Sequence, residues 1–189
     1  FVNALRDINL NIKEGDTIGL IGHNGSGKSS MLRLMSGILS PTSGKIHRNG
    51  KISCLINPNA GLNPEATGLE NIYLRSYLLG MTDQEVNKKL DKIINFADLG
   101  KFIDLPMRTY SSGMISRLSY SISTAIEPDI LLIDEGIGAG DKKFTDKIKE
   151  NTMSFLKKSK IVIFASHNLN FLKEINAKII KLEKGAIVN

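Results

Sequence analysis

A run of glycine, lysine and serine residues near the start of the chain has the types and spacing needed to hold phosphate. Residues 22–29 read Gly-His-Asn-Gly-Ser-Gly-Lys-Ser, the pattern G-x-x-x-x-G-K-[ST]. The apolar run Thr17–Ile21 precedes it, and a helical pattern, Ser30–Ile38, follows. Glycines let backbone N–H groups turn inward, and the following helix adds the positive end of its dipole. These residues therefore predict a phosphate-binding loop.

Lys28 and Ser29 give this loop its charge and its metal ligand. We expect the Lys28 ammonium group to reach the β- and γ-phosphates of a nucleotide, and the Ser29 hydroxyl to bind Mg²⁺. A glycine-rich turn without function is the alternative, but the preceding strand and following helix are the context that phosphate binding requires. The predicted nucleotide contacts are Gly22, His23, Asn24, Gly25, Ser26, Gly27, Lys28, Ser29 and Ser30.

Two acidic residues end a second apolar run. Residues 129–135 read Asp-Ile-Leu-Leu-Ile-Asp-Glu, which is typical of a strand buried on both faces. Open α/β sheets bind ligands at the carboxyl ends of their strands. We therefore expect Asp134 to reach the metal ion, and Glu135 to act as general base on the attacking water. Acids at a strand end are also common as turn residues or helix caps.

Two further positions have both a functional and a structural interpretation. His167 closely follows the apolar run Ile161–Ala165, where it is either a packed or capping residue or a sensor of the γ-phosphate. Residues 110–114 read Tyr-Ser-Ser-Gly-Met and open a helical pattern that runs to Ala125. Serine and glycine at a helix N-terminus make an anion site, although serine is also a preferred plain N-cap.

Strands and helices alternate along the chain to position these residues. Residues 8–12 and 17–21 read as an antiparallel hairpin, and short strands are expected at 45–47 and 51–56, giving a β lobe beside the nucleotide. Helices are expected at 69–79 and 82–97, the second opening with the capping box Thr82-Asp83-Gln84-Glu85. A helix at 142–157, a strand at 161–165 and an apolar run at 179–188 follow.

This order predicts an α/β fold, a P-loop NTPase three-layer core with an antiparallel β lobe and an inserted all-helical subdomain. We expect one domain over residues 1–189, with the core at about 1–56 and 127–189 and the helical subdomain at about 64–125. No internal repeat interrupts this order.

Composition narrows the class of protein. The chain has 189 residues, 41% apolar and 23% charged, which suits one globular domain. No run approaches 18 apolar residues, so we expect no segment that spans a bilayer, and a membrane role only through a partner. The net charge of +6 comes from scattered lysines, which favours solvated helix faces over nucleic-acid binding. The single cysteine, Cys54, favours a reducing compartment, and the start at Phe1 indicates a trimmed chain or a fragment.

These motifs together resemble a known family. The phosphate loop, the segment 110–114, the strand end at Asp134-Glu135, Asp141 and His167 have the order and spacing of the nucleotide-binding domain of an ABC transporter. The resemblance covers essentially the whole chain. Residues 110–114 correspond to the family's signature, and we use that name for them below.

The resemblance implies an assembly and an activity. Two copies would pair head-to-tail around two ATP molecules with Mg²⁺, each ATP lying between the phosphate loop of one copy and the signature of the other. ATP hydrolysis would drive a separate transmembrane permease subunit, with the chain held peripherally at the cytoplasmic face of the inner membrane. Asp141 would contact the partner copy, which is compatible with its being an N-cap. The residues implied to act on the partner's nucleotide are Ser111, Ser112, Gly113 and Met114.

The segments 63–73, 110–117 and 134–141 look like the ATPase subunits of bacterial exporters of O-antigen, capsule and teichoic-acid polysaccharides. Some positions depart from the general family. The usual signature Leu-Ser-Gly-Gly-Gln reads Tyr-Ser-Ser-Gly-Met here, and the usual glutamine after the β lobe is absent. Asn57, Pro58 and Asn59 occupy that region, where the Asn57 amide is a candidate substitute, and Phe1 is the candidate for the aromatic that stacks on adenine.

Three alternatives remain. A soluble ABC ATPase in translation or DNA repair would explain the basic charge, but the chain has neither a tandem domain nor a coiled-coil insertion. A GTPase or a small-molecule kinase lacks support, since Asn87-Lys88-Lys89-Leu90 breaks the guanine-reading pattern Asn-Lys-x-Asp at its fourth position. An ABC exporter of drugs, peptides or lipids shares all of the chemistry and differs only in its membrane partner.

Overall fold

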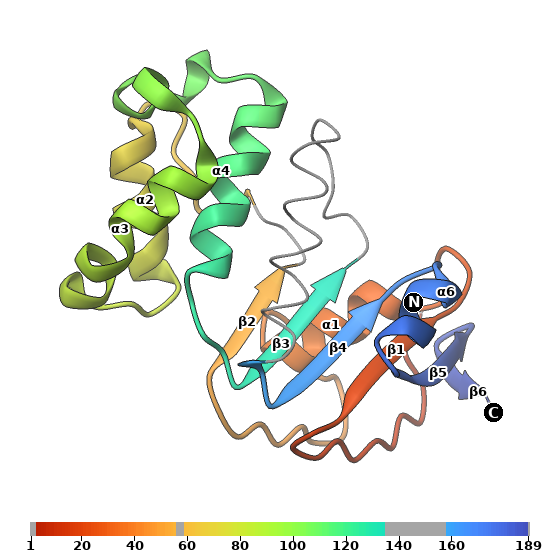
Figure 1. The fold of residues 1–189 in the computed structure, drawn as a ribbon. Helices are drawn as coiled ribbons and strands as arrows, with labels where there is room; N and C mark the ends of the chain where they lie inside the picture. Colours follow the sequence, from red (N-terminus) through yellow and green to blue (C-terminus); the bar gives the residue numbers. More distant parts are fainter. Residues whose placement is uncertain (1–2, 56–58, 135–157, 189) are drawn as a thin grey trace. The chain divides into compact units, whose positions relative to one another are not determined.

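The computed structural model describes residues 3–55, 59–134 and 158–188, and these residues form two compact units. The first, which we call the core unit, contains residues 3–55, 128–134 and 158–188. The second, the helical unit, contains residues 59–127. The chain therefore leaves the core unit after its second strand and returns to it before the third (Figure 1).

One sheet organises the core unit (Figure 1). Its strands are β1 (Thr17–Ile21), β2 (Ile52–Leu55), β3 (Ile130–Asp134), β4 (Ile161–Ala165), β5 (Lys178–Glu183) and β6 (Ala186–Val188). They lie in the order β2-β3-β4-β1-β5-β6. The first five in this order run parallel, and β6 returns antiparallel to β5. Parallel strands place their carboxyl ends at one edge, so the ends of β1, β3 and β4 meet there.

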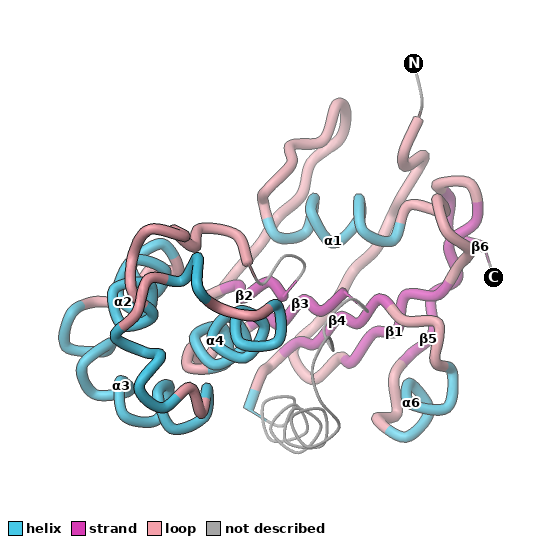
Figure 2. The backbone as a smooth tube through the Cα atoms, turned by 90° about the horizontal axis from the view of Figure 1, so that it is seen from above, coloured by secondary structure: helices cyan, strands magenta, loops and turns pink. Residues whose placement is uncertain are grey.

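Helices cover both faces of this sheet (Figure 2). On one face, α1 (Lys28–Ser36) buries Met31 and Leu32 against strand residues such as Leu132. On the opposite face lies α6 (Leu169–Glu174). Its Leu172 lies so close to β1 that a Cβ on Gly19 would be 2.9 Å from the Leu172 Cδ1 atom. Apolar burial on both faces explains why the strands read as continuous apolar runs.

The antiparallel hairpin expected at 8–12 and 17–21 is wrong. Both edges of β1 are occupied by parallel strands, β4 on one side and β5 on the other, so residues 8–12 have no free edge on which to pair. Ile8, Leu10 and Ile12 are half-buried and pack against the core, which accounts for their alternation without a ladder. Residues 45–47 are also not a strand, and β2 pairs parallel with β3. Residues 8–12 and 45–47 therefore do not form the antiparallel β lobe expected beside the phosphate loop, and the antiparallel pair that lies there is β5 and β6.

The helical unit packs three α-helices around its own apolar cluster. These are α2 (Gly68–Leu78), α3 (Asp83–Ala97) and α4 (Ser112–Thr124), with the 3₁₀ turns η1 (Gly100–Asp104) and η2 (Met107–Thr109) between the last two. Ile72, Val86, Ile93, Leu118 and Ile122 are fully or almost fully buried where the three helices meet. The capping box expected at Thr82 and Glu85 is confirmed, and α2 has a second one, formed by Thr67 and Glu70.

In the described part of the chain, no helix has the length and apolarity needed to cross a membrane. The helix expected at 142–157 lies outside the described residues.

Candidate nucleotide-binding site

The phosphate loop joins β1 to α1, as the sequence predicts, and two of its glycines are required by close approach. A Cβ on Gly22 would lie 2.3 Å from the carbonyl oxygen of Leu182. Gly27 has a φ of 107°, and a Cβ there would lie 2.7 Å from the Leu5 side chain. The loop is therefore tightly held between β5 and the segment that precedes residue 6.

The helix that follows the loop begins without a side-chain cap. Gly27 is the N-cap of α1 and makes no side-chain cap bond, and the first turn contains no acidic residue. The first N–H groups of a helix have no partner within it, and the helix dipole makes this end positive. The start of α1 is thus suited to bind an anion such as phosphate.

Lys28 brings a full positive charge to the same place. Its side chain is buried within the loop, with 8% of the residue exposed, and its Nζ atom donates to the carbonyl oxygens of Gly22 at 2.6 Å and His23 at 3.2 Å. An ammonium group has three donors. These two bonds leave one donor for a phosphate oxygen, so Lys28 is held in place by the loop that it serves.

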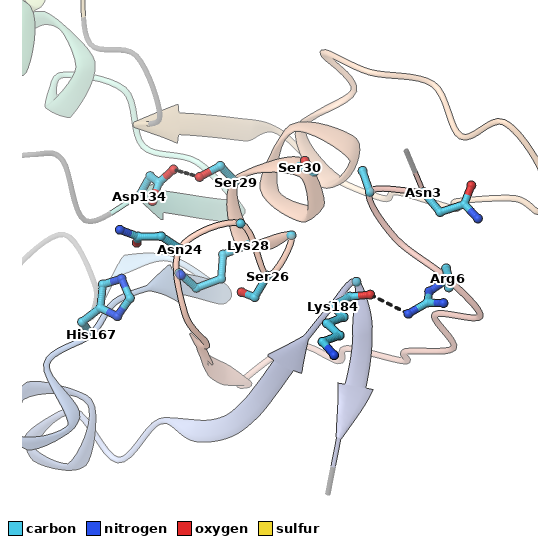
Figure 3. A pocket seen from close by; sticks show the side chains of 14 residues that line it. Asn3, Arg6, Asn24, Ser26, Lys28, Ser29, Ser30, Asp134, His167 and Lys184 are labelled. Atoms are coloured by element: carbon cyan, nitrogen blue, oxygen red, sulfur yellow. Dashed lines mark hydrogen bonds between the residues drawn. The ribbon is translucent and has the colours of Figure 1, made fainter. Parts of the chain in front are cut away.

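Ser29 and Asp134 meet although 105 residues separate them. The Ser29 hydroxyl donates to the Asp134 Oδ2 atom at 2.7 Å (Figure 3). Ser29 lies in the first turn of α1, and Asp134 ends β3, where it stands in register with Ala165 of β4. The sheet topology therefore places this carboxylate beside the phosphate loop.

A hydroxyl and a carboxylate are the oxygen ligands that Mg²⁺ prefers. Among the described residues, no three His, Cys, Asp or Glu side chains gather as a metal site of their own. This donor set fits a Mg²⁺ ion that takes its remaining ligands from a bound nucleotide and from water.

A pocket of about 900 Å³ opens over the loop (Figure 3). Nine residues predicted from the sequence line it: Asn24, Gly25, Ser26, Gly27, Lys28, Ser29, Ser30, Asp134 and His167. Gly22 and His23 support it from below by accepting the Lys28 bonds. His167 follows β4 at the same edge of the sheet as Asp134, and in Figure 3 its imidazole lies on the Asn24 side of the loop. The structure thus gathers the phosphate loop, one strand-end acid and the histidine in one cavity.

Five lining residues were missed by sequence reasoning, namely Asn3, Ala4, Arg6, Lys184 and Gly185. Backbone bonds link two of them to the loop: the Arg6 N–H donates to Gly185 O at 2.7 Å, and the Gly185 N–H donates to Ser26 O at 3.0 Å. Arg6 also donates to the Lys184 carbonyl oxygen at 2.9 Å. The turn at Lys184-Gly185 could be read from the sequence, but its place beside the loop depends on β5 pairing with β1.

The signature lies in the helical unit, at the start of α4. Ser111 is the N-cap, and its Oγ atom accepts a hydrogen bond from the Met114 N–H at 3.2 Å. Ser111 and Ser112 are exposed, and a Cβ on Gly113 would meet nothing closer than 3.8 Å. Met114 packs partly against the apolar cluster of its own unit. The exposed part of the signature is therefore its serines and the N-terminal backbone of α4.

Asn59 is held by the same helix, because the Ser119 hydroxyl donates to its Oδ1 atom at 2.8 Å. The other predicted site residues, Phe1, Asn57, Pro58, Glu135 and Asp141, lie outside the described residues.

Comparison with known proteins agrees with this geometry. Residues 5–138 match the ABC transporter family. The chain is 48% identical over 168 residues to the O-antigen export system ATP-binding protein RfbB of Myxococcus xanthus, covering 89% of this chain and 38% of that protein. It is 43% identical to the teichoic acids export ATP-binding protein TagH of Staphylococcus haemolyticus, covering 97% of this chain and 69% of that protein. The chain thus spans well under half of the first of these relatives.

A solved structure agrees in fold. The dimeric, post-hydrolysis state of the ATP-binding cassette MJ0796, bound to ADP and Pi, superposes with a TM-score of 0.79 at 26% identity, covering all of this chain and 90% of that one. A family match over more than two thirds of the chain, together with the relatives, excludes the GTPase and small-molecule kinase interpretations. This chain belongs to the ABC transporter family.

Proposed function

We propose that this chain is the ATP-binding and ATP-hydrolysing subunit of an exporter that moves a cell-surface polysaccharide of the O-antigen type. The observation that carries the ATPase part of the proposal is the pocket in which the uncapped start of α1, Lys28 and the Ser29–Asp134 pair meet. This arrangement has a site for phosphate charge and a site for Mg²⁺ next to each other, as ATP hydrolysis requires.

Each residue has a defined task in this proposal. Lys28 and the first N–H groups of α1 hold the β- and γ-phosphates, and Ser29 and Asp134 hold Mg²⁺, which neutralises charge that develops on the phosphate oxygens. Glu135, the residue after β3, takes the proton from the attacking water, and His167 contacts the γ-phosphate from the end of β4.

A second copy of the chain completes the site. The signature serines are exposed, and a Cβ on Gly113 would meet no atom closer than 3.8 Å, so the helical unit itself does not require a glycine there. An open, serine-capped helix start is suited to an anion that comes from outside the unit. We assign this anion to the γ-phosphate of ATP bound by the partner copy, with Asp141 at the contact between the copies. The dimeric state of the MJ0796 cassette supports this assignment.

The relatives support the substrate class. Those compared above are named as subunits of O-antigen and teichoic-acid export systems. A separate transmembrane permease would carry the polysaccharide, and the chain would bind it peripherally at the cytoplasmic face of the inner membrane. No nucleic acid takes part. In cells that make such a polysaccharide, loss of the ATPase should leave the polymer inside, which fractionation of surface and internal polymer would detect; normal surface polymer would contradict the substrate class.

Replacing Glu135 by Gln tests the hydrolytic role. The amide keeps the size of the side chain but cannot accept the proton, so we expect ATP binding to persist while turnover falls at least about a hundredfold. Equilibrium ATP binding and steady-state hydrolysis measure the two effects. Glu183→Gln, an exposed carboxylate of β5, is the matched control and should hydrolyse ATP normally. Unchanged turnover in Glu135→Gln would refute the general-base assignment.

A further inference from the structure

The chain reaches the signature through a segment that is fastened to the loop before α2. Thr67 and Pro106 form an antiparallel bridge. The Met107 N–H donates to Ala66 O at 2.9 Å, and the Arg108 N–H donates to Pro64 O at 2.8 Å. Residues 106–108 thus lie antiparallel along residues 64–67, and the position of one segment sets that of the other.

The loop before α2 is itself rigidly held. Asn71, which is completely buried, donates from its Nδ2 atom to the carbonyl oxygens of Asn63 at 2.9 Å and Thr67 at 2.9 Å, and its Oδ1 atom accepts from the Asn63 N–H at 2.7 Å. A buried amide that satisfies its partners in this way fixes the backbone around it. The segment before the signature therefore rests on a fixed support.

Tyr110 directly precedes the signature serine Ser111, and it contacts both the segment before the signature and the start of α2. The residue is 8% exposed, its N–H donates to Met107 O at 2.9 Å, and its hydroxyl donates to the carbonyl oxygen of Phe102. The hydroxyl lies at the first residue of α2, because a Cβ on Gly68 would be 2.3 Å from the Tyr110 Oη atom. Burial raises the pKa of Tyr110, while a hydrogen bond from the Gly68 backbone opposes the rise and the Asp104 charge adds to it.

We propose that Tyr110 is a positioning residue of the signature: its hydroxyl, seated between the Phe102 carbonyl and the start of α2, fixes where Ser111 and the first N–H groups of α4 meet the nucleotide of the partner copy. The inference rests on the proposed function, because it needs a composite site. The leucine that the wider family carries at this place has no hydroxyl, so this anchor is a property of this chain's own signature.

Tyr110→Phe tests the anchor, since it keeps the ring and removes only the hydroxyl. Loss of one buried hydrogen bond should raise the protein concentration for half-maximal ATPase activity about fivefold. ATP binding by dilute protein depends on the core unit and should stay as in wild type. Tyr73→Phe is the matched control, because it also removes one tyrosine hydroxyl bond in the helical unit, to the exposed side chain of Asn87, and its activity should match wild type.

Mixing experiments separate positioning from loss of folding. The mixtures are compared at a protein concentration at which Tyr110→Phe alone has little activity. When Tyr110→Phe is mixed with Lys28→Ala, the mixed dimer has one site made of an intact loop and an intact signature, so activity should rise above that of either variant alone. When the double variant Lys28→Ala/Tyr110→Phe is mixed with wild type, the intact loop of the wild-type copy faces the altered signature of the double variant. This mixed dimer should therefore add little to the activity of the wild-type dimers. Equal behaviour of the two mixtures would overturn the inference.

Gly68 provides an independent test. Gly68→Ala should raise the protein concentration for half-maximal ATPase activity in the wild-type background, because its Cβ would displace the Tyr110 hydroxyl. In the Tyr110→Phe background, the same substitution should raise this concentration less. Fully additive effects would contradict the seating of the hydroxyl against Gly68. If wild type itself shows no dependence on concentration, the proposed function fails; if wild type shows it and Tyr110→Phe matches wild type, only the inference about Tyr110 fails.

Discussion

At the scale of single residues, Ser29 and Asp134 are the proposed ligands of Mg²⁺, and their hydrogen bond links the phosphate loop to the end of β3. The Ser29 hydroxyl can donate to the Asp134 carboxylate and at the same time offer its lone pairs to a cation. Removing the hydroxyl would leave the carboxylate in place but take one of the proposed ligands from the ion. We therefore expect loss of the Ser29 hydroxyl to weaken ATP binding when Mg²⁺ is present.

We expect Ser29→Ala to lower the gain in ATP affinity that Mg²⁺ provides by at least about tenfold, with ATP affinity in excess EDTA unchanged. Titrating ATP in the two conditions measures the difference. Ser36→Ala is the control, because Ser36 lies at the other end of α1 and donates only to the Arg33 carbonyl oxygen. An equal loss of affinity with and without the metal ion would contradict the assignment of Ser29.

Residue types and spacing were enough to predict residues of the phosphate loop, Asp134 and His167 that line one pocket, because each belongs to a local motif next to a strand end. Arg6 and Lys184 could not be found in this way, because they reach the pocket only through the pairing of β5 with β1. Met114 shows a different limit. Its place in the signature predicts that it acts on the partner's nucleotide, which stays a prediction, and the sequence did not indicate that its side chain packs partly against the apolar cluster of the helical unit.

At the scale of elements, the amino ends of β2, β3 and β4 are joined by one carboxylate. Asp129 accepts hydrogen bonds from the Lys51 N–H at 2.8 Å and the Lys160 Nζ atom at 3.2 Å. The backbone bond from Lys51, followed by the bond and charge of Lys160, lowers the pKa of Asp129 below its usual 3.8. A depressed folded-state pKa stabilises the fold above the unfolded-state pKa and loses this effect as the pH falls through the folded-state pKa.

Asp129→Asn should therefore lower the urea midpoint at neutral pH, and the difference from wild type should shrink as the pH falls below 3.8. Urea unfolding of both proteins from about pH 7 to about pH 3 measures this. Lys160→Ala should lower the urea midpoint at neutral pH less than Asp129→Asn does, since the bond from the Lys51 N–H to Asp129 remains. A difference that is constant across this range would mean that Asp129 acts through packing rather than charge.

The elements also show which patterns predict reliably. Strand β4 was predicted to the residue, and α3 within one, because an unbroken apolar run and a capping box are local signals. The hairpin at 8–12 was wrong, because alternation reports which side chains are buried and says nothing of which strand is adjacent. Here the two neighbours of β1 come from residues 161–165 and 178–183, far along the chain.

At the scale of the whole molecule, the residues assigned to one reaction are divided between two compact units. The phosphate loop, Asp134 and His167 belong to the core unit, and the signature with its Tyr110 anchor belongs to the helical unit. The proposed function unites them across two copies of the chain. This division could be anticipated from the family resemblance, but no periodicity or spacing within one sequence reports a contact between two molecules.

The most direct test of the central claim is the ATP hydrolysis rate against protein concentration, for wild type and for Lys28→Ala and Ser111→Arg separately and mixed. We expect the wild-type rate per molecule to rise with concentration, each variant alone to be nearly inactive, and the mixture to regain activity. In the mixed dimer, one site would combine the phosphate loop of the Ser111→Arg copy with the signature of the Lys28→Ala copy. Neither of these two parts carries a substitution. A rate per molecule that is independent of concentration, with no recovery on mixing, would contradict a site shared between two copies.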